Sequence, residues 1–214
     1  MVIAIVSAKG GTGKSTITLN LAGAFLKIKR KVLIVDTDPQ GSITQWAAIR
    51  KQEEPDILSV SARGFDKKSK KLAKRYEIIL IDTPPTFKKS MRSVIHAADR
   101  LIIPVSPGLA DYWSTEQLLD FYRAEKEKRL NLDARLLISR IDRRTRLGRD
   151  FRFFLERLSI PIFMTEIPQR VIYSESWHEG LTVDRLQPNG SGTKDFRLLV
   201  KEILVWQTRS WLIK

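Results

Sequence analysis

A glycine-rich loop near the start of the chain has the residue types and spacing that suit phosphate chemistry. An apolar run, residues 2–7, precedes this loop, and a segment with helical spacing of apolar residues follows it. Glycines let backbone N–H groups turn toward an anion, and the N-terminus of a following helix adds its dipole. A loop of this kind between a strand and a helix predicts a site for nucleotide phosphates. The candidate contacts are Gly10, Gly11, Thr12, Gly13, Lys14, Ser15 and Thr16.

Two lysines and a serine in this loop are the candidates for binding charge. We expect Lys14 to bridge the β- and γ-phosphates and the hydroxyl of Ser15 to reach Mg²⁺. The common pattern G-x-x-x-x-G-K-[ST] fails at its first position, which is Ala8, and a second lysine, Lys9, lies in the loop. The loop therefore has the form K-G-G-x-G-K-[ST].

Carboxylates follow two later apolar runs. Asp36-Thr-Asp38-Pro comes after the second run, and Ile78-Ile-Leu-Ile leads directly into Asp82. A buried strand that ends in one carboxylate presents that group to hydrated Mg²⁺, which predicts a metal role for Asp82. The sequence D-x-D-P taken alone is also compatible with a simple turn.

Taken in this order, the motifs resemble those of the ParA/MinD family of deviant Walker ATPases, and most closely the short ParA-type partition ATPases. The resemblance covers most of the chain and implies ATP/ADP and Mg²⁺ as cofactors. It also implies that Lys9 reaches across a homodimer interface to the nucleotide phosphates of the partner subunit. A second cation placed in this way stabilises the transferring phosphoryl group only when two subunits close face to face.

The same resemblance assigns further residues. Asp36 and Asp38 lie in a segment similar to switch I, with Asp38 positioning or activating the attacking water and Asp36 closer to Mg²⁺ or its waters. The implied catalytic set is Lys9, Lys14 and Asp38, and the implied metal set is Ser15, Asp36 and Asp82. Residues 165–170 resemble a base-flanking loop, in which the backbone around Pro168 packs against adenine. Ser139 departs from the family pattern, because many relatives have an Asn-Arg pair at this place.

Apolar runs that alternate with helical segments predict the fold. The runs are residues 2–7, 31–35, 77–81, 100–105 and 135–139. This alternation predicts an α/β fold in which a mainly parallel, twisted sheet has helices on both faces. The length favours a single P-loop ATPase domain over residues 1–214. We expect a last helix from Lys194 to about Trp206.

The charge balance predicts a polyanionic partner. The chain has 38 Lys+Arg against 24 Asp+Glu, a formal net charge of +14. Such an excess favours nucleic acid first and an acidic membrane surface second, although it also serves solubility.

Two basic runs are candidates for that partner, and residues 140–157 rank above the run Lys67–Arg75. We expect the apolar side of the first run to comprise Leu147, Phe151, Phe154, Leu155 and Leu158. Its predicted exposed DNA-binding residues are Arg144, Arg146, Arg149 and Arg152. An ordinary solvated arginine face is the alternative.

The expected function is a partition ATPase whose ATP-bound dimer binds DNA nonspecifically and whose turnover is stimulated by a partition partner. The expected location is cytoplasmic and nucleoid-associated, since no signal-peptide pattern or membrane-length apolar run is present. A membrane-associated, MinD-like positioning ATPase is the alternative, with residues 204–214 as an amphipathic tail. That tail is equally compatible with a core helix. The absence of cysteine excludes a bridging iron–sulfur cluster like that of the nitrogenase iron protein.

Overall fold

One parallel sheet organises the molecule. The computed structural model describes residues 1–85 and 89–209. In this part of the chain the seven strands follow the order β3-β2-β4-β1-β5-β6-β7, and every pair is parallel. The strands are β1 (Val2–Ile5), β2 (Val32–Asp36), β3 (Asp56–Ser59), β4 (Ile78–Asp82), β5 (Arg100–Val105), β6 (Asp133–Ile141) and β7 (Ile167–Pro168). The predicted fold class and the five predicted strands are confirmed, whereas β3 and β7 were not predicted.

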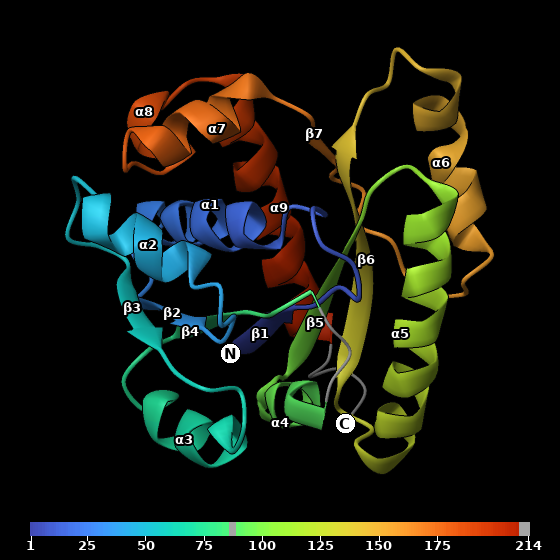
Figure 1. Ribbon diagram of the computed structural model, residues 1–214, viewed down its shortest axis with the longest axis horizontal. Helices are drawn as coiled ribbons and strands as arrows, with labels where there is room; N and C mark the ends of the chain where they lie inside the picture. The colour runs from blue at the N-terminus through green and yellow to red at the C-terminus, as the bar shows by residue number, and fades with distance from the viewer. Residues whose placement is uncertain (86–88, 210–214) are drawn as a thin grey trace.

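Helices cover both faces of this sheet (Figure 1). On one face, an apolar core contains residues of α3 (Phe65–Leu72), α4 (Lys89–Ala97), α5 (Leu109–Lys128) and α6 (Arg146–Glu156). On the other face, the core contains residues of α1 (Lys14–Lys27), α2 (Ser42–Ile49), α7 (Val171–His178), α8 (Val183–Leu186) and α9 (Ser191–Arg209). The strands β1, β2, β4 and β5 are buried along their whole lengths, as expected for a sheet covered on both faces.

The register of the central strands brings the candidate carboxylates together. Asp36, the last residue of β2, is the direct partner of Asp82, the last residue of β4. Ile5 of β1 pairs with Asp82 from the other side, so the phosphate loop leaves the sheet beside both carboxylates. The loop ends at Gly13, which caps α1. The carboxyl edge of the sheet is therefore the place where the candidate residues meet.

The last helix, α9, belongs to the core over its described length. Trp206 is buried, its indole N–H donates to Asp133 at 2.6 Å, and its ring meets Phe163 edge to face. This contact favours the core-helix interpretation of the tail up to Arg209. The remaining tail residues, Trp211 among them, lie outside the described residues. Among the described helices, none is long and apolar enough to cross a bilayer.

Candidate nucleotide site

Two glycines give the phosphate loop its backbone path. Gly11 and Gly13 have φ angles of +79° and +86°, in the left-handed region that side chains disfavour. Gly13 lies at the N-terminus of α1, so the first free N–H groups of this helix face the loop. An anion bound in the loop would therefore meet the positive end of the α1 dipole.

Ser15 and Asp82 form a polar corner at the start of α1. The Ser15 hydroxyl donates to Asp82 at 2.6 Å, and the Thr18 hydroxyl lies 3.4 Å from the other carboxylate oxygen. Burial is the main reason that the pKa of Asp82 is raised to about 7; the charge of Asp36 acts in the same direction, and the Ser15 hydrogen bond and Lys14 act against it. A buried carboxylate beside a hydroxyl is a suitable pair of oxygen ligands for a hydrated divalent cation, which would also stabilise the ionised form.

Asp36 shapes the loop that carries Asp38. One carboxylate oxygen of Asp36 accepts from the Asp38 N–H at 3.1 Å. The other oxygen accepts from the backbone N–H and the hydroxyl of Thr44, at 2.9 and 2.7 Å. Asp38 itself is half-buried, and one of its oxygens accepts from the Gln40 N–H at 2.9 Å. Asp36 thus orders the loop, and Asp38 is placed on it at the sheet edge.

The two lysines of the phosphate loop have different environments. Lys14 is buried, and its ammonium lies 3.3 Å from the Lys9 carbonyl oxygen. Burial lowers the pKa of Lys14, opposed by the charges of Asp82 and Asp38. The Lys9 side chain is 43% exposed, and its ammonium pairs at 2.5 Å with Asp111 of α5. Sequence reasoning missed Asp111, because 102 positions separate it from Lys9 and no local pattern marks it.

A pocket beside the loop brings Gly13 and Thr16 together with Pro168. Ser139 and Arg140 of β6 also line this pocket and bind the backbone of the loop. The Ser139 hydroxyl donates to the Thr12 carbonyl at 2.7 Å, and Arg140 donates to the Gly11 carbonyl at 2.8 Å. Ser139 is therefore committed to the phosphate loop. The rest of the lining is Ile17, Ile167, Gln169, Arg170, Tyr173 and Ser174.

The residues present fit a nucleotide with a divalent cation. Lys14 supplies a buried cation, Ser15 and Asp82 supply oxygen ligands, and the pocket at Pro168 adjoins the loop. The buried Thr12 hydroxyl has no hydrogen-bond partner among the described residues. Such a group is available to a ligand that enters the loop.

Residues 3–183 match the family described as the CobQ/CobB/MinD/ParA nucleotide binding domain. The chain belongs to this family. The predicted ParA/MinD membership is thereby confirmed.

Curated relatives of this ParA/MinD chain span nearly its whole length. Maintenance of carboxysome distribution protein A of Gloeobacter kilaueensis is 30% identical over 218 residues, which are 94% of this chain and 93% of the relative. Chromosome-partitioning ATPase Soj of Thermus thermophilus is 26% identical over 238 residues, with 94% of each chain covered.

Solved structures share the ParA/MinD fold with this chain. MinD of Pyrococcus horikoshii, complexed with Mg-ADP, has a TM-score of 0.77 at 21% identity, covering 94% of this chain and 95% of its own. Cobyrinic acid a,c-diamide synthase of Mycobacterium smegmatis, with an ATP analogue and magnesium, has a TM-score of 0.80 at 20% identity, covering 95% and 93%. At these identities the likeness establishes the fold.

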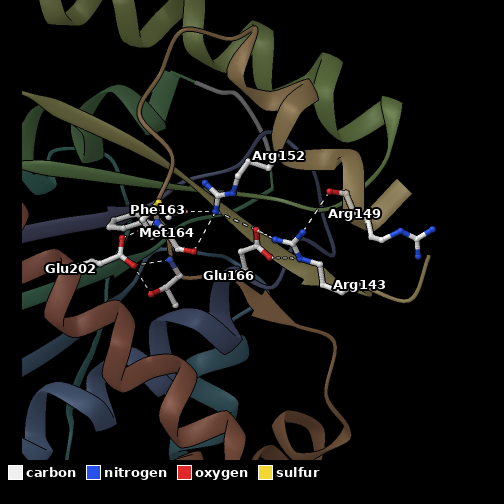
Figure 2. Close-up of polar contacts among 8 residues, drawn as sticks. Arg143, Arg149, Arg152, Phe163, Met164, Glu166 and Glu202 are labelled. Atoms are coloured by element: carbon white, nitrogen blue, oxygen red, sulfur yellow. Dashed lines mark hydrogen bonds and ion pairs between the residues drawn. The ribbon is translucent and has the colours of Figure 1, made fainter. Parts of the chain in front are cut away.

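The arginine-rich surface of this ParA/MinD chain differs from the prediction at Arg152. The Arg152 side chain is only 24% exposed and donates to the Phe163 carbonyl at 2.7 Å and to Glu166 at 3.2 Å. Figure 2 shows Arg143 and Arg152 both turned toward Glu166, whereas the Arg149 side chain extends away from it. The prediction that Arg152 lies on an exposed surface is therefore wrong, because an acid from another segment folds against it.

The predicted apolar side of α6 is also partly wrong. Phe151, Leu155 and Leu158 are buried as expected, but Leu147 and Phe154 are 46% and 38% exposed. Gly148, the third residue of α6, is buried and faces the core. A Cβ there would lie 2.0 Å from the Asp142 carbonyl oxygen, so glycine is required by close backbone packing. The helix turns this small residue inward and leaves Leu147 and Phe154 at the margin.

Proposed function

We propose that this chain is a ParA-type ATPase. In this proposal ATP with Mg²⁺ closes a sandwich dimer, the dimer binds DNA without reading its sequence, and hydrolysis releases it to position a cargo. The observation that carries the proposal is the environment of Lys9. Its ammonium pairs with Asp111 of α5, and its side chain remains 43% exposed.

The contrast with Lys14 supports a role for Lys9 in the partner subunit. Lys14 is buried in the loop and is sufficient to supply the cation within its own subunit. Lys9 is held by an ion pair to Asp111, whose side chain is only 10% exposed, so contacts to phosphate must offset the loss of this pair. We infer that closure of a dimer exchanges Asp111 for phosphate oxygens of the opposite nucleotide. Hydrolysis would then depend on dimerisation, because the second cation reaches the phosphates only in the closed form.

Mg-ATP, when bound, supplies the reactive phosphoanhydride and the metal's charge. The chain's residues would position it: Lys14 and the loop amides would hold the phosphates, and Ser15 and Asp82 would hold the metal. Asp38 lies on the loop that Asp36 orders. In this proposal it would orient the attacking water. The related folds solved with Mg-ADP, or with an ATP analogue and magnesium, support a magnesium-bound adenine nucleotide as the ligand.

A basic surface supports DNA as the partner of the dimer. The chain carries a formal net charge of +14, and Arg144, Arg146 and Arg149 at the start of α6 are exposed. Contacts to phosphates carry no sequence information, so binding through them is nonspecific. The relatives named for carboxysome distribution and chromosome partitioning support cargo positioning. In this proposal a cargo-bound partner stimulates turnover, and the protein acts in a nucleoid-associated, cytoplasmic setting.

Alanine variants of the two loop lysines test the proposal as a matched pair, since each removes one ammonium from the same loop. Lys9→Ala is expected to bind ATP with near-parental affinity but to remain a monomer, because it removes only the cross-subunit interaction. Lys14→Ala is expected to lose nucleotide itself. Nucleotide titration and light scattering with Mg-ATP measure the two properties. Equal loss of ATP affinity in both variants would show that Lys9 acts within its own subunit, and this would contradict the sandwich-dimer model.

A further inference from the structure

Helix α3 and the turn after it carry an unneutralised basic face. Residues 63–75 contain seven cations and a single acid, Asp66. All seven cations are exposed. They are Arg63, Lys67, Lys68, Lys70, Lys71, Lys74 and Arg75. We define the lysine face as Lys67, Lys70, Lys71 and Lys74.

The packing of α3 fixes the direction of this face. Phe65 and Ser69 are buried, and Leu72 packs against the core, so residues at the spacing i, i+4 and i+7 point inward. At 100° per residue the lysine face lies on the opposite side of the helix. The apolar residues of α3 thus pack it against the core, and this orientation exposes the lysines to solvent.

No member of the lysine face has an ion pair or a side-chain hydrogen bond to any other residue in the described part of the chain. The arginines of α6 differ, because Arg144 pairs with Asp142 at 2.7 Å and Arg152 pairs with Glu166 at 3.2 Å. A phosphate that approaches α6 must compete with these carboxylates. A phosphate that approaches the lysine face meets no such competitor on the lysines themselves.

We propose that the lysine face of α3 is the principal phosphate-binding surface for double-stranded DNA. This inference rests on the proposed function, which requires nonspecific DNA binding but does not require it at α3. At a helical rise of about 1.5 Å per residue, continued through the turn after Leu72, Lys67 and Lys74 are about 10 Å apart. One strand of duplex DNA presents roughly three phosphates over that length, at about 3.4 Å of axis each. The four lysines of the face therefore span about three phosphates of one strand.

An anionic membrane is the less suitable partner for this face. A helix that lies in a lipid interface inserts its apolar side between the headgroups. The apolar side of α3 is unavailable for insertion, because Phe65 is fully buried against the sheet. Only electrostatic attraction to lipid headgroups would remain.

The lysine face is separate from the nucleotide site, which makes the inference testable. Helix α3 connects the carboxyl end of β3 to the start of β4, which lies at the opposite edge of the parallel sheet. Lys74, shortly before β4, is therefore close to that opposite edge. A groove that includes Lys67, Lys70 and Val2, the first residue of β1, agrees with this direction. Charge changes at Lys67 and Lys71 therefore lie away from the phosphate loop.

Three double charge reversals in the full chain test the inference: Lys67→Glu/Lys71→Glu, Arg146→Glu/Arg149→Glu, and Arg197→Glu/Lys201→Glu. Each removes the same net charge, and the third pair is an exposed control on α9. Fluorescence anisotropy with a mixed-sequence duplex and Mg-ATP measures affinity over a salt series, and flotation with phosphatidylserine vesicles tests lipid. At about 0.1 M salt, removing one lysine–phosphate interaction lowers the association constant roughly eightfold. We therefore expect the affinity of the α3 pair to fall at least tenfold and that of the α9 pair to fall much less.

The neutral variant Lys67→Gln/Lys71→Gln is a control for misfolding caused by charge reversal. It should reduce the slope of log affinity against log salt by about 0.9 for each phosphate that is no longer neutralised. Affinity of both α3 variants within twofold of the parent, or an equal decrease in the α9 pair, would overturn the inference. If the α6 pair alone fails to bind, the inference fails while the proposed function stands. If the parent binds vesicles but no duplex, the inference and the DNA part of the proposed function fail together.

Discussion

The cations of α6 and those of α3 differ in what surrounds them. Around α6, Arg143 and Arg152 converge on Glu166, Arg144 pairs with Asp142, and Arg146 lies 3.7 Å from Asp150. On α3 the lysines project into solvent without such partners in the described chain. The two regions have similar numbers of cations in the sequence, but they offer different amounts of charge to a partner. The number of basic residues in a segment therefore indicates how much positive charge its surface offers only after the acids packed against them are known.

The largest expected difference between the two regions is in stability. Arg152→Ala removes hydrogen bonds to the carbonyl oxygens of Phe163 and Met164 and an ion pair to Glu166. We expect it to lower the free energy of unfolding by about 1–3 kcal/mol, because the carbonyl of buried Phe163 and the largely buried carboxylate of Glu166 no longer receive hydrogen bonds from this charged group. Lys68→Ala on α3 should change this free energy by less than about 0.5 kcal/mol.

Thermal unfolding followed by circular dichroism compares these variants. A domain of this size loses about 2–4 °C in Tm for each kcal/mol. Equal Tm values for Arg152→Ala and Lys68→Ala would mean that the α6 arginine is no more structural than a solvated lysine.

A smaller effect is expected on DNA affinity when Glu166 is neutralised. Glu166→Gln keeps the side-chain shape and removes the charge that holds Arg143 and Arg152, so the α6 surface should bind DNA severalfold more tightly. Glu202→Gln is the matched control, because it makes the same change of net charge nearby. Its carboxylate accepts from the backbone of Met164 and Thr165 rather than from an arginine.

Anisotropy titrations of both glutamate variants at one salt concentration give the comparison. An equal rise in affinity would attribute the gain to net charge alone, and no rise in Glu166→Gln would show that this acid does not restrain the arginines.

Much of the fold was predictable from local patterns. The buried strands run as unbroken apolar segments, and the phosphate loop carries its own chemistry in consecutive residues. The strand β3 was not predicted, because it lies at the sheet edge, where Asp56 and Ser59 are exposed and the sequence has no continuous apolar run. The strand β7 is only two residues long, and its pairing with β6 is set by the tertiary fold.

The candidate site divides in the same way. Ser15 and Asp82 were predicted to serve one cation, and the Ser15 hydroxyl, in the first turn of α1, lies 2.6 Å from the Asp82 carboxylate at the end of β4. The partner of Lys9 was not predictable, because Asp111 comes from a distant helix. Glu166 was missed for a related reason: it lies outside the arginine-rich run against which it folds. Sequence patterns predict contacts within one helix, strand or loop, whereas Asp111 and Glu166 each contact a residue from a different element.

The most direct test of the central claim, an ATP-driven switch in DNA binding, uses Asp38→Ala with and without Mg-ATP. This variant should bind ATP and form a persistent dimer without turnover, because Asp38 is assigned to the attacking water. A dimer doubles the number of phosphates neutralised, so ATP should tighten binding to two unrelated duplexes equally and steepen the log–log dependence on salt about twofold. The same affinity and salt slope with and without ATP, or a strong preference for one duplex, would contradict the account.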